Sequence, residues 1–203
     1  MVDWKCTPLD YDFFMPGYVR WYSEGATYFF TIVTENRAPL FRSESNRDML
    51  RRAIERCREV HSFTVDAMVL LPEHLHVLMT LPKQVDDFST RIRWIKSNFT
   101  REFLAQGQRE QPGSESRIRR GNRGVWQRRF YEHLCRDEED VGRHVEYIHF
   151  NPVKHGLAKC PHEWRFSTFN RWVAGGQYPA DWYCSCEQNI SPPNFDWTNS
   201  DME

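Results

Sequence analysis

The sequence predicts an α+β protein built on a four-stranded antiparallel sheet, with the element order βαββαβ and one further helix. Three observations lead to this class: four runs of β-branched, aliphatic and aromatic residues, two amphipathic stretches between them, and a two-residue break that makes two of the runs a hairpin. A βαββαβ string places both helices on one face of the sheet, which is the ferredoxin-like arrangement. The further helix, with part of residues 153–183, then covers the opposite face.

The first half of the chain supplies three strands and one helix. Residues 28–33 form a β-branched and aromatic run, and residues 46–60 follow with the periodicity of an amphipathic helix. Residues 63–71 and 74–81 are apolar runs separated by only two residues. Because so short a connection forces an antiparallel hairpin, these two runs are expected to be adjacent strands.

The second half supplies the remaining elements. Residues 88–104 are predicted to form a helix, with apolar residues at three- to four-residue spacing and basic residues around them. Residues 125–134 are predicted to be the fourth strand. A third helix is expected over residues 138–151, because Asp137 can cap its start, acidic residues fill its first turn, and Pro152 ends the pattern.

Charge is distributed unevenly along the chain, although the net charge is only −1. Residues 91–130 hold eleven Lys or Arg against three Asp or Glu, and the rest of the chain holds sixteen against twenty-five. A net charge near zero would usually argue against a nucleic-acid partner, but the total hides a basic stretch within an acidic remainder. Residues 106–124 are predicted to be a mobile basic loop. We expect one domain over residues 1–183 and an acidic, poorly ordered tail over 184–203.

Cysteine usage and hydropathy predict where the protein works. The six cysteines, at positions 6, 57, 135, 160, 184 and 186, form no C-x-x-C pair and no regular framework, so we expect reduced thiols. The first residues contain no apolar signal region, and no run reaches the roughly 18 apolar residues of a membrane span. The expectation is a soluble, cytoplasmic protein with no membrane partner.

The predicted strand 74–81 begins with His74-Leu75-His76. Side chains alternate across a strand, so the two histidines share one face about 6.6 Å apart in backbone rise, and Leu75 enters the core. Both imidazoles can therefore reach one metal ion. Taken alone, an H-x-H in a strand is more often a pair of half-exposed histidines on a solvated face.

The third predicted helix contains Tyr147 and Asn151, which are i, i+4 neighbours. They lie beside a stripe of apolar residues, Val141, Val145 and Ile148, that fixes which way the helix faces. Taken alone, the pair is better explained structurally: Tyr147 packs beside the core, and Asn151 caps the end of the helix before a proline.

The two features are more specific together than apart. If this helix covers the open face of the sheet, Tyr147 lies over His74 and His76, and Asn151 adds an oxygen ligand. A divalent ion can polarise a scissile phosphate while a positioned tyrosine attacks it to form a covalent phosphotyrosine. The pattern predicts a site that cleaves phosphodiesters.

Three segments carry a family resemblance. The histidine pair looks like the HUH motif, which is histidine, bulky hydrophobic, histidine. The chain from about residue 25 to 182 resembles the REP-associated tyrosine transposases of the single-tyrosine HUH transposase superfamily. The segments, in chain order, are VLLPEHLHVL at 69–78, WQRRFYEH at 126–133 and YIHFNPVKHGL at 147–157.

The resemblance implies a metal-dependent endonuclease and strand transferase that acts on single-stranded DNA at palindromic REP-type hairpins. Tyr147 matches the family's nucleophile, and His74 and His76 match two metal ligands. Asn151 stands where relatives among insertion-sequence transposases have a glutamine ligand, and its shorter side chain leaves direct ligation open. The implied cut leaves a 5′-phosphotyrosine and a free 3′ hydroxyl, and the attachment conserves bond energy for rejoining.

Cofactor and partners follow from the same resemblance. Two histidines and an amide accommodate several ions, so the ligand types alone do not identify the metal. Magnesium or manganese is expected from the phosphate chemistry and the family. The expected partner is single-stranded or hairpin DNA, which implies association with the nucleoid in use. The REP-associated branch implies a monomer, whereas related insertion-sequence enzymes dimerise and share sites.

Candidate DNA contacts are basic and aromatic side chains of two segments and of the end of the tyrosine helix. Arg and Lys would contact phosphates and Trp would stack on unpaired bases, although such residues are commonly a solvated helix face or part of a core. The candidates are Arg91, Arg93, Trp94, Lys96, Trp126, Arg128, Arg129, Lys154 and His155.

Two other functions stay open at this point. One is a metal-dependent phosphodiesterase that uses water, with Tyr147 only positioning the substrate; replacing Tyr147 with Phe separates the two mechanisms. The other is a catalytically silent hairpin-binding protein. The presence of His74, His76 and Tyr147 argues against it.

Overall fold

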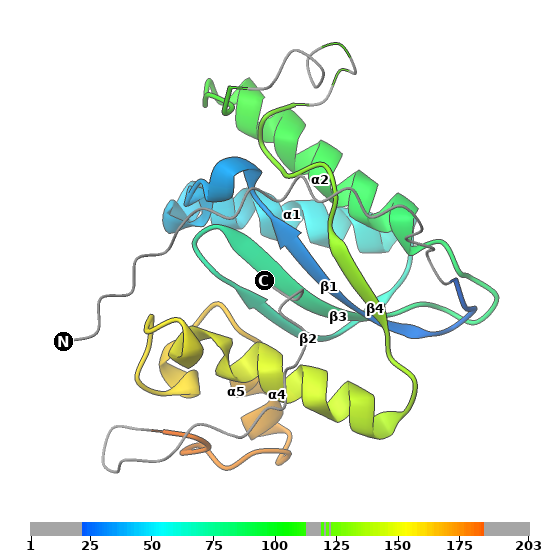
Figure 1. The fold of residues 1–203 in the computed structure, drawn as a ribbon, viewed down its shortest axis with the longest axis vertical. Helices are drawn as coiled ribbons and strands as arrows, with labels where there is room; N and C mark the ends of the chain where they lie inside the picture. The colour runs from blue at the N-terminus through cyan, green and yellow to red at the C-terminus, as the bar shows by residue number, and fades with distance from the viewer. Residues whose placement is uncertain (1–21, 113–118, 120, 122, 185–203) are drawn as a thin grey trace.

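A computed structural model of the chain describes residues 22–112, 119, 121 and 123–184 (Figure 1). Three short 3-10 turns, over Glu35–Arg37, Leu40–Arg42 and Pro161–Glu163, connect the main elements. In chain order these are β1 (Thr27–Val33), α1 (Glu44–Val60), β2 (Thr64–Leu70), β3 (His74–Thr80), α2 (Phe88–Ala105), β4 (Tyr131–Leu134), α4 (Glu138–Lys154) and α5 (Phe169–Ala174).

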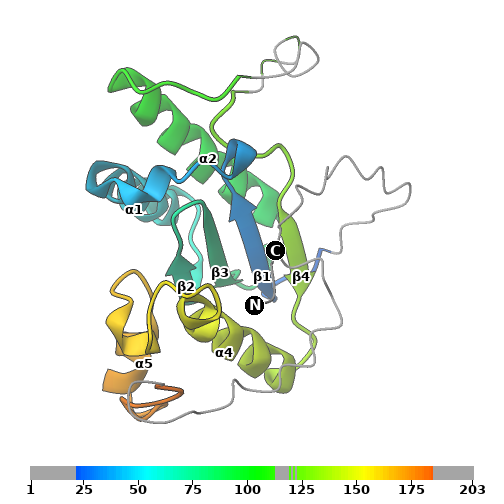
Figure 2. The ribbon, with the colours of Figure 1, turned by 60° about the vertical axis from the view of Figure 1, so that its left-hand side comes forward.

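The four strands form one sheet in the order β2-β3-β1-β4, and every neighbouring pair is antiparallel. Helices α1 and α2 cover one face of this sheet, and α4, with α5 beside it, covers the other (Figures 1 and 2). The predicted ferredoxin-like arrangement with an added C-terminal helix is confirmed. Strands β1 and β3 are central, so side chains on them are shielded from both edges.

Strand β3 divides its side chains between two hydrophobic clusters. Leu75, Val77 and Met79 pack in the larger cluster, beneath α1 and α2. Leu78 packs in the smaller cluster with Val145 and Ile148 of α4. Because strand side chains alternate, the histidines at positions 74 and 76 face α4 with Leu78. The predicted assignment of the two faces is confirmed.

The predicted fourth strand is too long. Only Tyr131–Leu134 pairs with β1 as a strand, and the segment before it makes a single isolated bridge between Trp126 and Thr34. Trp126 instead turns into the core, where its ring packs 5.1 Å from the ring of Phe99. An apolar run that enters a core is indistinguishable from a strand by composition alone.

The third helix continues past Pro152, where it was predicted to end. Pro152 has no N–H to donate within the helix, but it still accepts a hydrogen bond from the backbone N–H of Leu157 at 2.8 Å. The N–H of His155 donates to the carbonyl of Asn151 at 3.0 Å. The extra turn places Lys154 and His155 beside the histidine pair.

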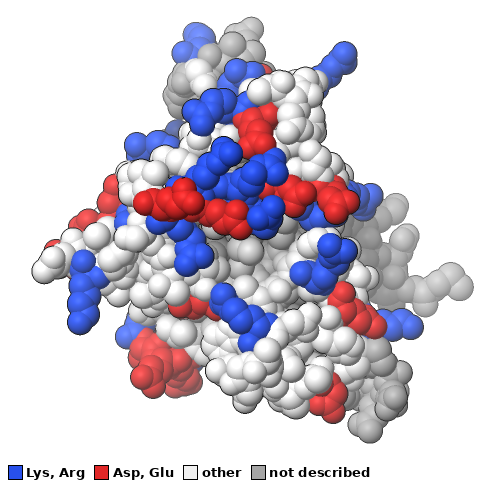
Figure 3. Space-filling view, turned by 180° about the vertical axis from the view of Figure 1, so that it is seen from behind, with Lys and Arg blue, Asp and Glu red and all other residues white. Residues whose placement is uncertain are grey.

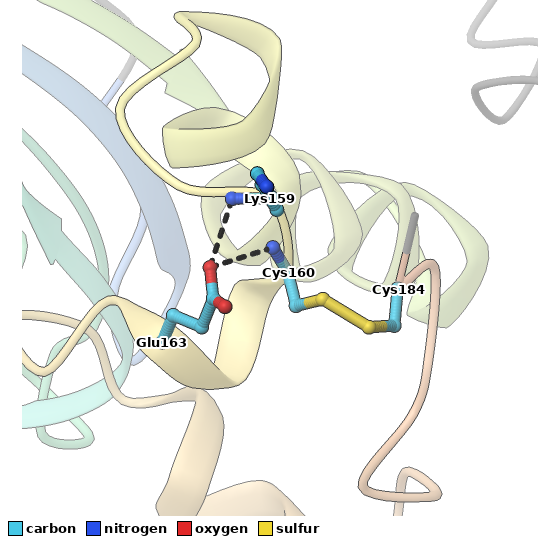
Figure 4. Close-up of a disulfide and its surroundings, with 4 residues drawn as sticks. All are labelled: Lys159, Cys160, Glu163 and Cys184. Carbon is cyan, nitrogen blue, oxygen red and sulfur yellow. Dashed lines mark hydrogen bonds between the residues drawn. A yellow bond between two sulfur atoms is a disulfide. The ribbon is translucent and has the colours of Figure 1, made fainter. Parts of the chain in front are cut away.

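All six cysteines were predicted to be reduced thiols, and this prediction is wrong for two of them. Cys160 and Cys184 form a disulfide across a sequence separation of 24 residues (Figure 4). Glu163 fixes the chain on one side of it by accepting hydrogen bonds from the backbone N–H groups of Lys159 and Cys160. Sequence spacing could not reveal this pair, because the turn that brings Cys184 back is formed by tertiary packing.

The predicted domain limits stay predictions. Residues 1–21 and 185–203 lie outside the described residues, as do most of 113–122, which belong to the loop predicted to be mobile. The described ends of that loop are joined by an ion pair between Arg123 and Glu110, with 2.8 Å between N and O. No helix in the described part of the chain is long and apolar enough to cross a membrane.

His149 of α4 is buried beneath α5 and predicts a pH-dependent stability. Its ring contacts aromatic residues of the 169–178 segment, and its Nε2 lies 2.8 Å from the hydroxyl of Thr168. Burial, with Arg171 nearby, lowers the pKa of His149 from 6.5 to about 3. Between these values the unfolded chain binds a proton that the folded chain does not. The free energy of unfolding therefore falls as the pH drops through this window, by up to about 1.4 kcal/mol per pH unit.

We expect the variant His149→Gln to show a shallower fall in unfolding free energy between about pH 6 and pH 4. The exposed His162 provides the control, because His162→Gln should keep the wild-type slope. Urea unfolding at each pH measures both variants. An unchanged slope in His149→Gln contradicts the assignment.

Candidate active site

The two histidines of β3 converge on one point. Both are buried, with exposed fractions of 2 % for His74 and 0 % for His76, and their Nε2 atoms lie 3.1 Å apart. Two nitrogen ligands at about 2.1 Å from one ion, at right angles, would be separated by about 3 Å. The observed distance is compatible with two ligands of one ion, and the metal site stays a prediction.

Each ring is held through its other nitrogen. Nδ1 of His74 lies 3.0 Å from the carboxylate of Glu73, and Nδ1 of His76 lies 2.9 Å from the hydroxyl of Thr31 on β1. Because a carboxylate accepts, Nδ1 of His74 carries the proton and its Nε2 presents a lone pair. Carboxylates and hydroxyls in this outer position orient metal-binding histidines.

Electrostatics keep His76 in the form that binds a cation. Burial, reinforced by the nearby His74, His155, Lys154 and Arg37, lowers the pKa of His76 well below its ordinary value. The hydrogen bond from His74 lowers the pKa of Glu73, with Arg37 contributing. At neutral pH, His76 is therefore uncharged and Glu73 is ionised, which are the forms required of a ligand and of the group that orients one.

Helix α4 places Tyr147 over the histidines. The Tyr147 ring centre is 5.2 Å from that of His76, and Phe29 of β1 contacts both rings, at 5.8 Å and 5.5 Å respectively. Tyr147 is only 2 % exposed and belongs to the smaller cluster with Ile148. It lies within the layer between helix and sheet, whereas the sequence placed it beside the core.

Asn151 is fully buried on the same helix, one turn after Tyr147. Neither its Oδ1 nor its Nδ2 has a hydrogen-bond partner among the described residues. Leaving a buried polar atom without a partner costs about 1–3 kcal/mol, so the amide is suited to a ligand that the folded chain alone does not supply. A buried amide oxygen together with two imidazoles is a donor set that accommodates a divalent cation.

Lys154 and His155 lie beside the buried residues of the site. The His155 ring is 5.6 Å from the His74 ring, and Nζ of Lys154 lies 5.2 Å from the centre of the Tyr147 ring. Both residues are exposed, whereas the groups that they contact are buried. Both exposed residues therefore lie next to groups of the candidate site.

The other residues predicted to contact DNA fall into two groups: some line a surface groove, and others are buried. A groove of about 690 Å³ runs between α2 and the segment before β4, and Arg93, Lys96 and Arg128 line it. The exposed Arg129 follows in the same segment. Trp94 is half-buried against the larger cluster.

Arg91 and Trp126 are interior residues, which argues against the DNA contacts predicted for them. Arg91 is 5 % exposed, and its guanidinium donates hydrogen bonds to the carbonyls of Ser62 and Asp87. Trp126 is 4 % exposed within the larger cluster. Both residues belong to the packing around α2, and Trp126 contributes only a small exposed part to the lining of the groove.

The face of the molecule opposite to that of Figure 1 carries charges of both signs. Figure 3 shows basic and acidic side chains interleaved across its upper half, where α1 lies. On α1 an arginine, Arg51, pairs with Asp48 at 3.7 Å and with Glu55 at 3.0 Å. This is a solvated helix face with paired charges, unlike the groove beside α2.

Sequence reasoning missed two residues of the site, Glu73 and Thr31. Glu73 was assigned only to the turn between two strands, and Thr31 only to a strand. A usable signal existed for Thr31, because it is a polar residue within an otherwise apolar central run. Its register partner, His76, becomes known only with the strand pairing.

The contact between Glu73 and His74 predicts a graded loss of metal affinity. Replacing the carboxylate in Glu73→Gln keeps the shape of the side chain but weakens the group that orients the ring. We expect a 10- to 100-fold weaker apparent affinity for Mn²⁺. The concentration of Mn²⁺ that half-saturates DNA cleavage measures this change. An unaltered midpoint contradicts the outer role of Glu73.

A ferredoxin-like sheet with a histidine pair on a central strand, facing a tyrosine on the covering helix, defines the class of single-tyrosine HUH enzymes that nick and join DNA. Comparison with known proteins agrees with this class. The family described as "Transposase IS200 like" matches residues 22–151. The REP-associated tyrosine transposase of Escherichia coli K12 is 42 % identical over 168 residues, which are 83 % of this chain and 91 % of that protein.

Two further comparisons specify the branch. A Haemophilus influenzae relative with the same family name is 37 % identical over 168 residues, covering 83 % of this chain and 93 % of its own length. A solved structure of a REP-associated tyrosine transposase bound to a REP hairpin has a TM-score of 0.69 and 41 % identity, over 83 % of this chain and 91 % of that one. The chain belongs to the REP-associated tyrosine transposases, within the IS200-like transposase family.

Proposed function

We propose that this protein cuts and rejoins one strand of DNA at palindromic REP-type hairpins through a covalent 5′-phosphotyrosine on Tyr147. The observation that carries the proposal is the convergence of the Nε2 atoms of His74 and His76 at 3.1 Å, beneath the ring of Tyr147. The relative that was solved with a REP hairpin supports the choice of substrate.

A divalent ion, Mg²⁺ or Mn²⁺, is the proposed cofactor, and His74, His76 and Asn151 are the residues that would hold it. When bound, it would polarise the scissile phosphate and neutralise charge on its oxygens. The unpartnered amide of Asn151 supports this ligand set. Glu73 and Thr31 keep the two imidazoles oriented with Nε2 toward the site.

The proposed chemical step exchanges one phosphate ester for another. The phenolic oxygen of Tyr147 attacks phosphorus, the bond from phosphorus to the 3′ oxygen breaks, and the 3′ oxygen leaves as a hydroxyl. The phenol loses one proton and the leaving oxygen gains one, so no co-reactant is consumed. Because ester bond energy is retained, the 3′ hydroxyl of another strand can reverse the step and rejoin the DNA.

Lys154 is proposed to assist the attack. Its ammonium lies over the Tyr147 ring, where a positive charge favours negative charge that develops on the phenolic oxygen and on the phosphate. His155, beside His74, is proposed to contact the same phosphate. Lys154 is the last residue of α4, and His155 is its C-cap.

The groove beside α2 is the proposed path of the DNA backbone. In the sheet, His74 pairs with Val33, whose carbonyl accepts a hydrogen bond from the N–H of Gln127 at 2.9 Å. Gln127 and the neighbouring Arg128 therefore lie level with the histidines, about 10 Å away across two strand spacings. A strand of DNA bound to the basic groove can thus reach the edge of the sheet nearest the site.

The groove predicts a specific salt dependence. Replacing two of its arginines, in Arg93→Gln/Arg128→Gln, should weaken hairpin binding and lower the slope of log affinity against log salt by about 0.7–0.9 for each phosphate that is no longer neutralised. Arg51→Gln on α1 is the matched control and should change neither quantity. Fluorescence anisotropy of a labelled hairpin over a salt series measures both. Equal slopes in wild type and the double variant contradict the groove assignment.

The proposal is tested with hairpin oligonucleotides carrying a label at the 5′ or the 3′ end. The protein is incubated with each oligonucleotide in Mn²⁺, Mg²⁺ or EDTA, and the products are separated on denaturing protein gels. We expect a metal-dependent adduct that retains only the label 3′ of the cut. The adduct should reverse when an oligonucleotide with a free 3′ hydroxyl is added.

Other outcomes favour the alternatives. Cutting without an adduct would identify water as the nucleophile and overturn the phosphotyrosine. Tight binding without cutting, across several hairpins and both metals, would identify a silent hairpin-binding protein. An adduct that retains the 5′ label would reverse the proposed polarity.

A further inference from the structure

A second group of metal-binding side chains lies at the corner between β4 and α4. His133 is on β4, Cys135 follows that strand, and His144 is on α4. One ligand atom from each of the three lies within 4.8 Å of the others. This group is distinct from the histidine pair of β3. The described residues contain one other such group, but its Cys160 and Cys184 are joined in a disulfide and offer no free thiols to a metal.

Asp140 connects the two histidines of this group. Its carboxylate lies 2.8 Å from Nε2 of His133, and its backbone carbonyl lies 2.8 Å from Nδ1 of His144. The two rings are stacked with their centres 4.7 Å apart. Metal-binding histidines characteristically donate their second N–H to a carboxylate or a backbone carbonyl, and Asp140 supplies one of each.

We propose that His133, Cys135 and His144 bind a structural zinc ion, with Asp140 orienting both rings. A set of two imidazoles and one thiolate is suited to Zn²⁺, and it is a softer donor set than the one at the catalytic histidines. A surface hollow of about 330 Å³ is lined in part by Cys135 and Asp137, so solvent can approach the cysteine from that side. When the bond from sulfur to zinc forms, the Cys135 thiol releases its proton to solvent.

The ion would fasten the tyrosine helix to the edge strand. His144 precedes Tyr147 by three residues on α4, and both of their rings contact Phe29, at 4.7 Å and 5.8 Å. Fixing His144 to β4 therefore fixes the register of the helix that carries the tyrosine. The proposal stands on these contacts alone and does not rest on the proposed DNA chemistry.

Cobalt substitution tests the site by its spectrum. The reduced, metal-free full-length protein is titrated with Co²⁺, which reports a thiolate ligand through a sulfur-to-cobalt charge-transfer band. We expect this band to develop with the first equivalent, together with the visible absorption of four-coordinate cobalt, and to disappear when Zn²⁺ is added. The catalytic histidines carry no thiolate, so His74→Gln/His76→Gln should retain the band.

Matched cysteine variants assign the band to one sulfur. It should be lost in Cys135→Ser but retained in Cys57→Ala and in Cys160→Ser/Cys184→Ser. If Cys135→Ser does not fold, His133→Gln and His144→Gln should each weaken cobalt binding at least 10-fold. Absence of the band in the wild-type protein, or an unchanged band in Cys135→Ser, overturns the proposal.

Discussion

The variant Tyr147→Phe should cut hairpin DNA at least about 10³-fold more slowly than the wild-type protein and should form no covalent adduct, because the substitution removes only the attacking oxygen. Tyr147 is 2 % exposed and its ring packs against Phe29 and His76, contacts that a phenylalanine ring keeps. Hairpin affinity should therefore stay within about threefold of wild type. Single-turnover cleavage and anisotropy binding, measured on the same oligonucleotide, separate the two effects.

Tyr131→Phe is the matched control for this experiment. Tyr131 is half-buried on β4, and its ring lies 6.2 Å from that of Phe29. It is in register with Thr31 on the same face of the sheet, so strand β1 separates it from the histidines of β3. We expect near-normal cutting and adduct formation. If Tyr147→Phe cuts at the wild-type rate, the tyrosine mechanism is wrong.

His76→Gln should abolish most metal-dependent cutting, with a loss of about 10²–10⁴-fold at a fixed concentration of Mn²⁺. The substitution removes one of two converging nitrogens from a residue that is fully buried between sheet and helix. The effect should exceed that of Glu73→Gln, which changes only the group that orients His74. A titration of cleavage rate against Mn²⁺, with circular dichroism to confirm folding, measures the difference.

The exposed His162 provides a control for the loss of one histidine outside the candidate site. His162→Gln should leave the midpoint for Mn²⁺ unchanged. If His76→Gln retained the wild-type midpoint, the histidine pair would not be the metal site. A larger loss in Glu73→Gln than in His76→Gln would reverse the proposed roles of these two residues.

Local sequence pattern was sufficient for most of the fold. The alternation in residues 74–81 correctly assigned His74 and His76 to one face and Leu75 to the other, because strand geometry permits only one such division. The two-residue connection before His74 similarly required a hairpin, and β2 pairs with β3 as expected. These features depend on neighbours in sequence, which is why the sequence alone could predict them.

The errors occurred where tertiary contacts override local pattern. Trp126 sits in an apolar run but enters the core against Phe99, which shortens β4. Pro152 was expected to end a helix that continues to Lys154. The bond between Cys160 and Cys184 depends on a return of the chain that no spacing rule encodes.

The candidate site was predictable in its reactive groups and unpredictable in its surroundings. The H-x-H pair and the tyrosine were recognisable because each has a fixed local spacing. Glu73 and Thr31 were not, because their roles depend on side-chain direction at a turn and on the register between two strands. The burial of Asn151 likewise depends on how closely α4 approaches the sheet.

Peptide mapping of the covalent adduct by mass spectrometry tests the central claim most directly. The wild-type protein is trapped with a hairpin oligonucleotide in Mn²⁺, the DNA is trimmed with nucleases, and the digested peptides are sequenced. The account predicts a single modified peptide in which Tyr147 carries a nucleotide through its 5′ phosphate. A nucleotide on any other residue, or cleaved DNA with a free 5′ phosphate and no modified peptide, would contradict it.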